Sequence, residues 1–297
     1  MTSLDQLPTE QTNPCTADID RLDTLGVLER LNDQDQRVAS AVRECSSELA
    51  RAVELTLERW RRGGRVVLFG AGTSGRLAML DAAELPPTFG IAAERYVARM
   101  AGGGAAFLRA LEGAEDDRLA GASTAADLSS NDVAFGIAAS GRTPWVLGAL
   151  EAARTAGALC LGLACVPAPE LAAYVDVCIA VDSGPEAIAG STRLKAGTAQ
   201  KLVLNAFSST LMIRLGKVYG NLMIDVQATN AKLRRRAQRL VEQAAAAEPS
   251  EAAAALDASG GQVKVAVVAL RLGVPAHEAA ARLAAADGDL RTALGET

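Results

Sequence analysis

The fold of this 297-residue chain is decided by one stretch, Arg65-Val-Val-Leu-Phe-Gly-Ala-Gly-Thr-Ser-Gly75. Its apolar, β-branched beginning is typical of a buried strand, and its glycine-rich remainder is typical of a tight turn. Apolar residues then follow at helical spacing, so a helix starts at the turn, and we expect Pro86-Pro87 to end it. Strand, turn and helix in this order predict the start of a βαβ unit.

The same pattern returns further along the chain. Val133–Ala139 is an apolar strand candidate, Ser140-Gly-Arg-Thr143 is a turn, and Trp145–Ala156 is helical after a proline that a first helical turn tolerates. Further strand candidates share short apolar runs: Tyr96–Met100, Ala158–Cys165 and Val175–Val181. Strands that alternate with helices predict an α/β fold with right-handed crossovers and a parallel sheet covered on both faces.

Helices dominate both ends of the chain. Helical patterns cover residues 17–31, 33–62 and 192–216, and alanine-rich helical segments follow Pro249 with glycine and proline stops between them. We expect three short helices there, packed as a small bundle. The sequence therefore predicts an N-terminal arm with helices (1–62), an α/β domain with its following helix (63–239) and a small helical C-terminal domain (240–297).

Composition limits the classes of function. Net charge is −5, so no large cationic surface is available for nucleic acid, and the basic run Lys232–Arg236 is expected to be a solvated helix face. No apolar run has membrane-spanning length, and Met1–Asn13 lacks the order of a signal peptide. Five cysteines without a CxxC pair and a sole histidine, His277, indicate a cytoplasmic protein without a metal site.

Hydroxyl groups gather at two of the expected strand–turn–helix junctions, as Thr73-Ser74 and as Ser140 with Thr143. A helix amino terminus offers unpaired N–H groups and a positive dipole end, which attract an anion. Each junction alone is explained as well by an ordinary N-cap. Two such junctions in one parallel sheet favour a phosphate site, because these folds bind ligands at the carboxyl ends of their strands.

Two further patterns carry little weight alone. Gly70–Gly75 has the GxGxxG spacing of a dinucleotide site, but the second strand expected before Glu94 is replaced by a proline turn. Acidic residues follow at Glu84 and in the run Glu112-Gly-Ala-Glu-Asp-Asp117. Pattern alone does not select a catalytic pair from the 35 acidic residues.

Five strings closely resemble the N-acetylmuramic acid 6-phosphate etherases, in register over nearly the whole chain. They are Thr9–Asp35 (TEQTNPCTADIDRLDTLGVLERLNDQD), Phe69–Gly90 (FGAGTSGRLAMLDAAELPPTFG), Gly136–Ala153 (GIAASGRTPWVLGALEAA), Gly190–Asn205 (GSTRLKAGTAQKLVLN) and Lys217–Leu233 (KVYGNLMIDVQATNAKL). The resemblance implies the sugar isomerase (SIS) fold, a three-layer α/β/α sandwich with a central parallel sheet and a small C-terminal helical bundle. It also implies a homodimer with active sites near the subunit interface.

The resemblance implies a mechanism with two carboxyl groups and no cofactor or metal. Glu115 is the implied base that takes the C2 proton of the open-chain sugar, and Glu84 is the implied acid that protonates departing D-lactate. Water then adds at C3. The implied binding residues match the family strings: Thr73, Ser74, Ser140, Gly141, Arg142, Thr143, Ser191 and Lys195.

Two other functions fit the same sequence pattern. One is a phosphosugar sensor that binds without turnover, as in the related glucokinase regulatory protein, which carries two SIS modules. The other is an aldose–ketose isomerase, which would share the phosphate site and use a carboxylate base. One module with both glutamates retained favours an enzyme over the sensor, and an assay for lactate release separates the etherase from the isomerase.

Overall fold

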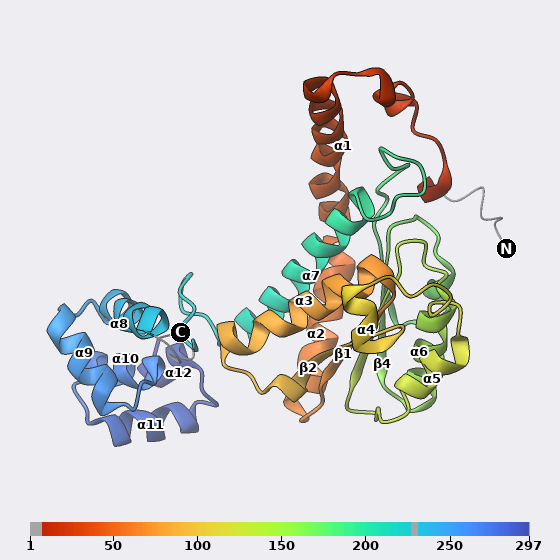
Figure 1. The fold of residues 1–297 in the computed structure, drawn as a ribbon. Coiled ribbons are helices and arrows are strands. Elements are labelled where there is room, and N and C mark those ends of the chain that lie inside the picture. Colours follow the sequence, from red (N-terminus) through yellow and green to blue (C-terminus); the bar gives the residue numbers. More distant parts are fainter. Residues whose placement is uncertain (1–7, 227–230, 297) are drawn as a thin grey trace. The chain divides into compact units, whose positions relative to one another are not determined.

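The structure, a computed structural model, describes residues 8–226 and 231–296 (Figure 1). Residues 1–7 of the polar N-terminal segment and residues 227–230 of the string 217–233 lie outside the described part. The chain forms two compact units, one of Met1–Ala83 with Ala93–Ser208 and one of Glu84–Ala92 with Ser209–Thr297.

The first unit is built on a five-stranded sheet in the order β2-β1-β3-β4-β5. All of its strands pair in parallel: β1 (Val66–Gly70), β2 (Tyr96–Met100), β3 (Val133–Ile137), β4 (Leu159–Ala164) and β5 (Val177–Ala180). The expected strands and their parallel pairing are confirmed. All five carboxyl ends therefore lie at one edge of the sheet.

Helices cover both faces of the sheet, which gives the expected three layers (Figure 1). On one face α6 (Pro144–Thr155) packs against β1, β3 and β4. A side chain at Gly136 of β3 would meet Leu150 Cδ1 at 2.7 Å, so the glycine lets this helix come close. On the other face α7 (Lys195–Arg214) packs through Phe207 on Phe135, with ring centroids 5.0 Å apart. This edge-to-face contact joins the middle strand to its second layer.

The expected N-terminal helices at 17–31 and 33–62 are wrong in their boundaries. The chain forms α1 (Thr24–Glu44) and α2 (Ser46–Arg61), which meet at Cys45. Asp23 caps α1 by accepting a hydrogen bond from Gly26 N–H at 2.8 Å. The predicted break between residues 31 and 33 is absent, because the apolar spacing continues through it. Among the described residues, short 3-10 turns at Pro8–Glu10, Pro14–Thr16 and Ile19–Arg21 precede α1.

The expectation that Pro86-Pro87 ends the first domain helix is also wrong. Helix α3 runs from Gly72 to Phe89 and contains both prolines in its last turns. It ends at Gly90, which has φ +64° and donates its N–H to Pro86 O at 2.9 Å. Each proline removes one backbone donor, so the helical bonds to the carbonyls of Ala82 and Ala83 are lost, yet the helix continues for one short turn until glycine closes it.

Smaller elements complete the first unit. They are η5 (Ala93–Arg95), α4 (Gly103–Leu108), α5 (Arg118–Thr124) and η6 (Glu170–Tyr174). Helix α5 lies against α6, and a side chain at Gly121 would come within 1.9 Å of Trp145 O. The two helices therefore touch through backbone at this point.

The second unit contains the expected bundle, with one helix more than the three predicted after Pro249. Its helices share one apolar core: α8 (Ala231–Ala245), α9 (Pro249–Ala258), α10 (Val263–Leu272), α11 (Ala276–Ala285) and α12 (Leu290–Leu294). Helix α8 continues across the predicted boundary at residues 239 and 240. Within the described residues no single helix is long and apolar enough to cross a membrane, and only α9 with α10 passes as a pair, bent by 117°.

All five cysteines are free thiols. Cys160 and Cys165 are completely buried in and beside β4, and burial raises the pKa of each thiol to about 12. Both therefore act as small core residues, as the apolar runs around them predict.

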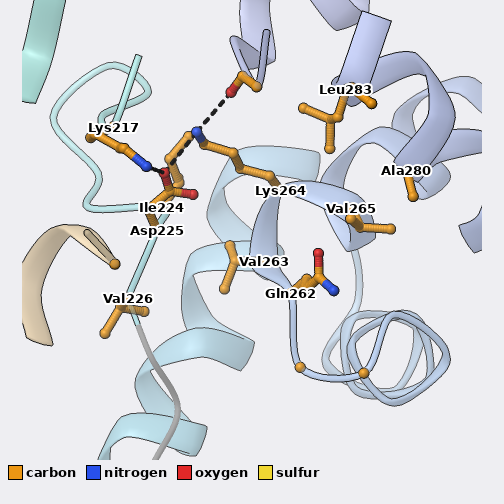
Figure 2. Close-up of a pocket in the computed structure, with 15 residues that line it drawn as sticks. Lys217, Ile224, Asp225, Val226, Gln262, Val263, Lys264, Val265, Ala280 and Leu283 are labelled. Carbon is orange, nitrogen blue, oxygen red and sulfur yellow. Dashed lines mark hydrogen bonds and ion pairs between the residues drawn. The ribbon is translucent and has the colours of Figure 1, made fainter. Parts of the chain in front are cut away.

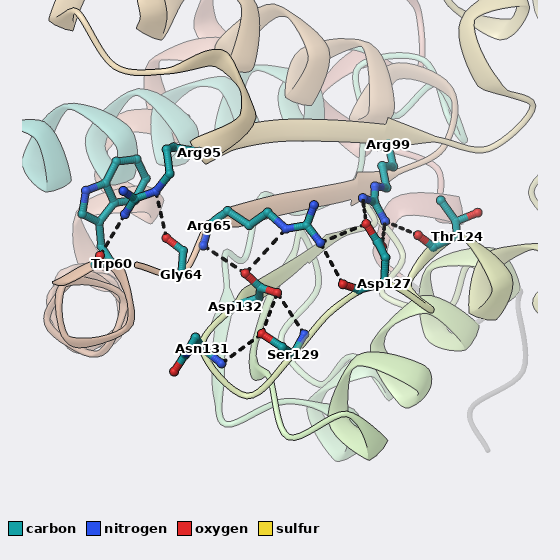
Figure 3. Close-up of polar contacts among 10 residues, drawn as sticks. All are labelled: Trp60, Gly64, Arg65, Arg95, Arg99, Thr124, Asp127, Ser129, Asn131 and Asp132. Carbon is teal, nitrogen blue, oxygen red and sulfur yellow. Dashed lines mark hydrogen bonds and ion pairs between the residues drawn. The ribbon is translucent and has the colours of Figure 1, made fainter. Parts of the chain in front are cut away.

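A polar network closes the edge of the sheet where the strands begin (Figure 3). Asp132 is 6% exposed and accepts hydrogen bonds from the N–H of Arg65, the N–H of Ser129 and the hydroxyl of Ser129 at 2.9–3.0 Å. The Asp127 side chain is 53% exposed, and it forms ion pairs with Arg65 and Arg99. The pair with Arg99 holds the pKa of the Asp127 carboxyl far below its ordinary value.

These two aspartates should differ in their effect on stability. We expect Asp132→Ala to lower the free energy of unfolding by about 2–4 kcal/mol, because it leaves buried donors without an acceptor. Asp127→Ala should cost less than about 1 kcal/mol, because exposed ion pairs are screened by solvent. Urea unfolding followed by circular dichroism measures both, and equal losses in the two variants would contradict this assignment.

Candidate functional site

The two hydroxyl-bearing junctions lie side by side. Strands β1 and β3 are paired neighbours, with Gly70 opposite Ile137 at their last residues. Helix α3 starts two residues after β1, and α6 starts after the turn that follows β3. The two helix amino termini therefore share the carboxyl edge of the sheet, as the sequence predicts for a phosphate site.

The first junction is held by backbone contact between strand and helix. A side chain at Gly75 would lie 2.8 Å from Gly70 O and 2.7 Å from Met100 Cγ, so only glycine fits. Within this turn Thr73 is half-buried and Ser74 is 7% exposed. The tight turn thus fixes both hydroxyl-bearing residues in the first turn of α3.

At the second junction the hydroxyl of Thr143 does not cap its helix. Thr143 is the N-cap of α6, yet its side chain makes no capping hydrogen bond, so it is not the ordinary cap that a single junction suggested. Gly141 has φ +68°, and a side chain there would lie 2.3 Å from Pro169 Cβ. Arg142 pairs with Glu170 at 3.6 Å, and Ser140 is half-buried.

A third helix begins at the same edge. A Cβ built on Gly197, in the first turn of α7, would lie 3.5 Å from Thr73 Cγ2. The thiol of Cys165, just after β4, donates to Ala196 O at 3.4 Å. Ser191, in the turn before α7, is half-buried, and its N–H donates to Ile188 O. The string Gly190–Asn205 thus places the start of α7 next to Thr73 of the first junction.

In its described hydrogen bond, the Lys195 ammonium contacts α1, not the hydroxyl groups of the two junctions. Its side chain is 3% exposed, and its ammonium donates to Gln34 Oε1 at 3.3 Å. The same oxygen accepts a hydrogen bond from Asn13 at 2.7 Å. The structure therefore gives the Lys195 ammonium a partner on α1, and its contact with substrate stays a prediction.

The sequence did not reveal Glu186, which is fully buried. Its carboxylate accepts the N–H of Lys195 and the N–H of Ala196, each at 2.9 Å, and so caps α7. Burial raises the pKa of Glu186, and the two N–H bonds oppose that rise. No spacing rule could find this cap, because the carboxylate stands nine residues before the helix, outside any N-cap pattern.

Glu115, the predicted base, lies beside the start of α3. It lines a cavity of about 190 Å³ with Ala71, Gly72 and Arg76. Its carbonyl accepts the N–H of Trp145 at 2.9 Å, which ties this segment to the start of α6. The Glu115 side chain is exposed, so a ligand can reach the carboxylate.

Arg76 is a second residue that the sequence did not reveal. Its guanidinium donates to Phe107 O at 3.0 Å and to Ala106 O at 2.8 Å, the last turn of α4. A cation suits a helix carboxyl terminus. Arg76 therefore holds the segment that leads to Glu115.

Glu84, the predicted acid, is exposed on α3 and belongs to the second unit. Asp81, one turn earlier on α3, is 3% exposed and accepts hydrogen bonds from the hydroxyls of Tyr96 and Ser208 at 2.9 and 3.2 Å. Burial raises the pKa of Asp81. The helix is thus tied to β2 and α7, while the catalytic role of Glu84 stays a prediction.

Comparison with known proteins gives one consistent family. Residues 114–209 match the SIS domain family, and residues 48–154 match the glucokinase regulatory protein N-terminal SIS domain. Among curated proteins, the N-acetylmuramic acid 6-phosphate etherase of Mycolicibacterium smegmatis is 50% identical over 98% of this chain and 99% of its own. The protein of the same name from Rubrobacter xylanophilus is 51% identical over 99% of this chain and 97% of its own.

A solved structure shares the fold. A phosphoheptose isomerase from Francisella tularensis covers 63% of this chain and 98% of its own, with a TM-score of 0.50 and 20% sequence identity. The predicted α/β/α SIS sandwich is therefore confirmed.

The cap of α7 should give the fold a measurable pH dependence. Because burial raises the pKa of Glu186 above its ordinary 4.5, the folded chain holds this proton where the unfolded chain has lost it. Protonation therefore stabilises the fold, and this contribution is lost as the pH rises. We expect the free energy of unfolding of the wild type, minus that of Glu186→Gln, to be larger at about pH 5 than at about pH 8.

Asp182→Asn is the control, since Asp182 is exposed in the same segment and bonds only Gly184 N–H at 3.1 Å among its described contacts. Its difference from the wild type should change little between the two pH values. A pH-independent difference for Glu186→Gln would show that this carboxyl has the same pKa in both states.

Proposed function

This chain belongs to the family of N-acetylmuramic acid 6-phosphate etherases, and we propose that it converts N-acetylmuramic acid 6-phosphate and water to N-acetylglucosamine 6-phosphate and D-lactate. The observation that carries the proposal is identity of about half of all residues along nearly the whole chain. The neighbouring helix amino termini at the sheet edge support it independently, because they suit a phosphate group.

We infer that the sugar phosphate binds with its phosphate between α3 and α6. Ser74 and Ser140 lie in the two neighbouring junctions, and Thr143 has a hydroxyl that α6 does not use as a cap. Hydroxyl and backbone N–H donors at two helix ends match the several acceptor oxygens of a phosphate. Ser191 precedes α7, whose first turn approaches Thr73, so it is the candidate for contact with the sugar.

The reaction needs one proton acceptor and one proton donor. The aldehyde of the open-chain sugar acidifies the C2 proton, which Glu115 removes, and the C3–O bond breaks as Glu84 protonates the oxygen that leaves with lactate. This elimination leaves a double bond between C2 and C3. Water then adds its hydroxyl at C3 and a proton returns to C2. Exposure of Glu115 beside the start of α3 supports its role.

The wider setting follows from this reaction. Because the step breaks a carbon–oxygen bond by elimination, the protein would be a carbon–oxygen lyase that acts in amino sugar catabolism and peptidoglycan recycling in the cytoplasm. We also propose a homodimer. Leu25 and Leu28 of α1 and Ile188 of the turn before α7 are 62%, 59% and 53% exposed, and apolar side chains of this size gain from a partner surface.

Isotope labelling tests the reaction against both alternatives. We expect the purified protein to release lactate from N-acetylmuramic acid 6-phosphate, and in oxygen-18 water the label should enter the sugar and not the lactate. The sugar should also take up deuterium at C2 in heavy water. Binding without lactate release would indicate a sensor, ketose formation would indicate an isomerase, and label in the lactate would rule out cleavage at C3.

Steady-state kinetics should distinguish the proposed catalytic residues, which affect kcat, from the proposed binding residues, which affect KM. We expect Glu84→Gln and Glu115→Gln to lower kcat by at least about 100-fold with little change in phosphate affinity, because each loses one proton transfer. Ser74→Ala and Ser140→Ala should chiefly raise KM, by about 10- to 150-fold, because each loses one charge-assisted hydrogen bond of about 1.5–3 kcal/mol.

Glu112→Gln is the matched control, since Glu112 is exposed in the same segment as Glu115. Its kcat and KM should stay near those of the wild type. An unchanged KM in both serine variants would refute the phosphate assignment, and an active Glu84→Gln variant would refute the acid assignment.

A further inference from the structure

The charged groups of a cavity in the second unit are paired with one another. This cavity, of about 500 Å³, is lined by Lys217, Asp225 and Lys264, and Asp225 Oδ2 lies 2.8 Å from both ammonium groups (Figure 2). Burial lowers the pKa of Lys264, and the charges of Asp225 and Asp289 oppose that shift. Two lysines therefore meet two aspartates, and these charges join the loop before α8 to α10.

The smaller cavity in the first unit is bounded by a segment that is loosely built. Between β2 and α5 the chain runs through α4, a helix of six residues, before it reaches Glu115. So short a helix is not stable on its own, because isolated helices need about 12–15 residues. Within α4, all of whose residues the structure describes, only Ala106 is buried. The place of this helix therefore depends on contacts with the rest of the first unit.

Glycines flank α4 on both sides. Gly102 and Gly103 before it have φ of +79° and +66°, and Gly113 after it has φ of +76°. No atom lies within 4 Å of a Cβ built on Gly103 or Gly113, so close packing does not hold the chain at these two positions. The N–H of Trp145 binds the carbonyl of Glu115, but one bond does not fix the chain that leads to it. A second anchor is needed.

Arg76 supplies that anchor at the carboxyl end of α4. Its guanidinium donates to Phe107 O at 3.0 Å and to Ala106 O at 2.8 Å. Carbonyls in the last turn of a helix have no partner within the helix, and a cation there meets the negative end of the helix dipole. Because the planar guanidinium binds two carbonyls at once, it fixes both the place and the orientation of α4.

Arg76 itself stands on a rigid part of the candidate site. It follows Gly75, which lies so close to Gly70 of β1 that a side chain would not fit, and it comes two residues after Ser74 in α3. Arg76 and Glu115 line the same cavity of about 190 Å³. The side chain of Arg76 therefore connects the turn of the proposed phosphate site with the segment of the proposed base.

We propose that Arg76 is a positioning residue for proton removal: it ties α4 to the phosphate-binding turn and so sets Glu115 at the C2 proton of the bound sugar. This role rests on the proposed function, in which Glu115 is the base. A sugar held by its phosphate at the start of α3 has its C2 at a set distance from that turn. A base on an unanchored segment would often be misplaced, and misplacement by about 1 Å can slow a reaction about 100-fold.

Steady-state kinetics of Arg76→Met tests this role. The variant keeps the apolar stem and loses both hydrogen bonds, so we expect kcat for lactate release to fall about 10- to 100-fold, with KM within about threefold of the wild type. Arg76→Lys keeps the charge on a single ammonium and should give an intermediate kcat. Arg109→Met is the matched control, since Arg109 is exposed in the same segment and its side chain bonds no described residue. Its kcat and KM should stay near those of the wild type.

Exchange of the C2 hydrogen isolates the step that Glu115 performs. In heavy water the base would take the C2 proton of N-acetylglucosamine 6-phosphate and a deuteron would return to C2, with no bond broken at C3. We expect Arg76→Met to slow this exchange as much as it slows lactate release. Exchange at the wild-type rate in Arg76→Met, or a loss confined to KM, would overturn the positioning role.

Backbone hydrogen–deuterium exchange followed by mass spectrometry tests the anchor without any reaction. Arg76→Met should speed amide exchange in peptides from residues 102–113 and leave that of β1 and β3 unchanged, and Arg109→Met should change neither. Unchanged exchange at residues 102–113 in Arg76→Met would also overturn the positioning role. Absence of lactate release by the wild type would instead refute the proposed function, and the backbone exchange would still decide whether Arg76 anchors α4.

Discussion

The pairing of β1 with β3 is the constraint on which the proposed phosphate site depends. In the order β2-β1-β3-β4-β5 the chain leaves β1 toward one edge of the sheet, and from β3 onward it builds toward the other. The connections at the two strands therefore diverge, and the space between their carboxyl ends is where doubly wound sheets bind ligands. Both hydroxyl-bearing turns face this space because the strands are adjacent. A different strand order would separate Ser74 from Ser140 without changing either local sequence.

Close backbone contact makes that arrangement rigid. Gly70 and Gly75 meet across the first turn, Gly141 meets Pro169 at the second, and Gly121 of α5 meets Trp145 of α6. The same Trp145 N–H binds the Glu115 carbonyl, so the contact between α5 and α6 also fixes the segment of the proposed base. Each glycine costs conformational entropy on folding. In return, neighbouring segments come closer together than any side chain would permit.

Most of the fold was predictable because its signals are local. Short apolar runs predicted the strands, and the hydroxyl groups at two junctions predicted a phosphate site that stays a proposal. The helix ends were harder to predict. Helix α1 ends at Cys45, which is not a typical stop residue, and α3 continues through Pro86-Pro87, which usually ends a helix. Contacts between distant segments were out of reach: Gln34 meets Lys195 across 161 residues, and Asp81 meets Ser208 across 127. No spacing rule encodes such pairs, because tertiary packing decides them.

Lys195 and Glu186 show that residues in and beside a family string can serve the fold as well as the substrate. Lys195 stands in a string shared with the etherases, which suggested substrate contact, yet its ammonium binds Gln34. Glu186 lies just before that string and, as the cap of α7, accepts the backbone N–H groups of Lys195 and Ala196, the first two residues of this helix. Because the first turn of α7 approaches Thr73, this cap also fixes a helix that lies beside the proposed phosphate site. The buried Glu186 carboxylate therefore fixes the start of α7, and the shared string reflects the position of this helix as well as the proposed substrate contacts.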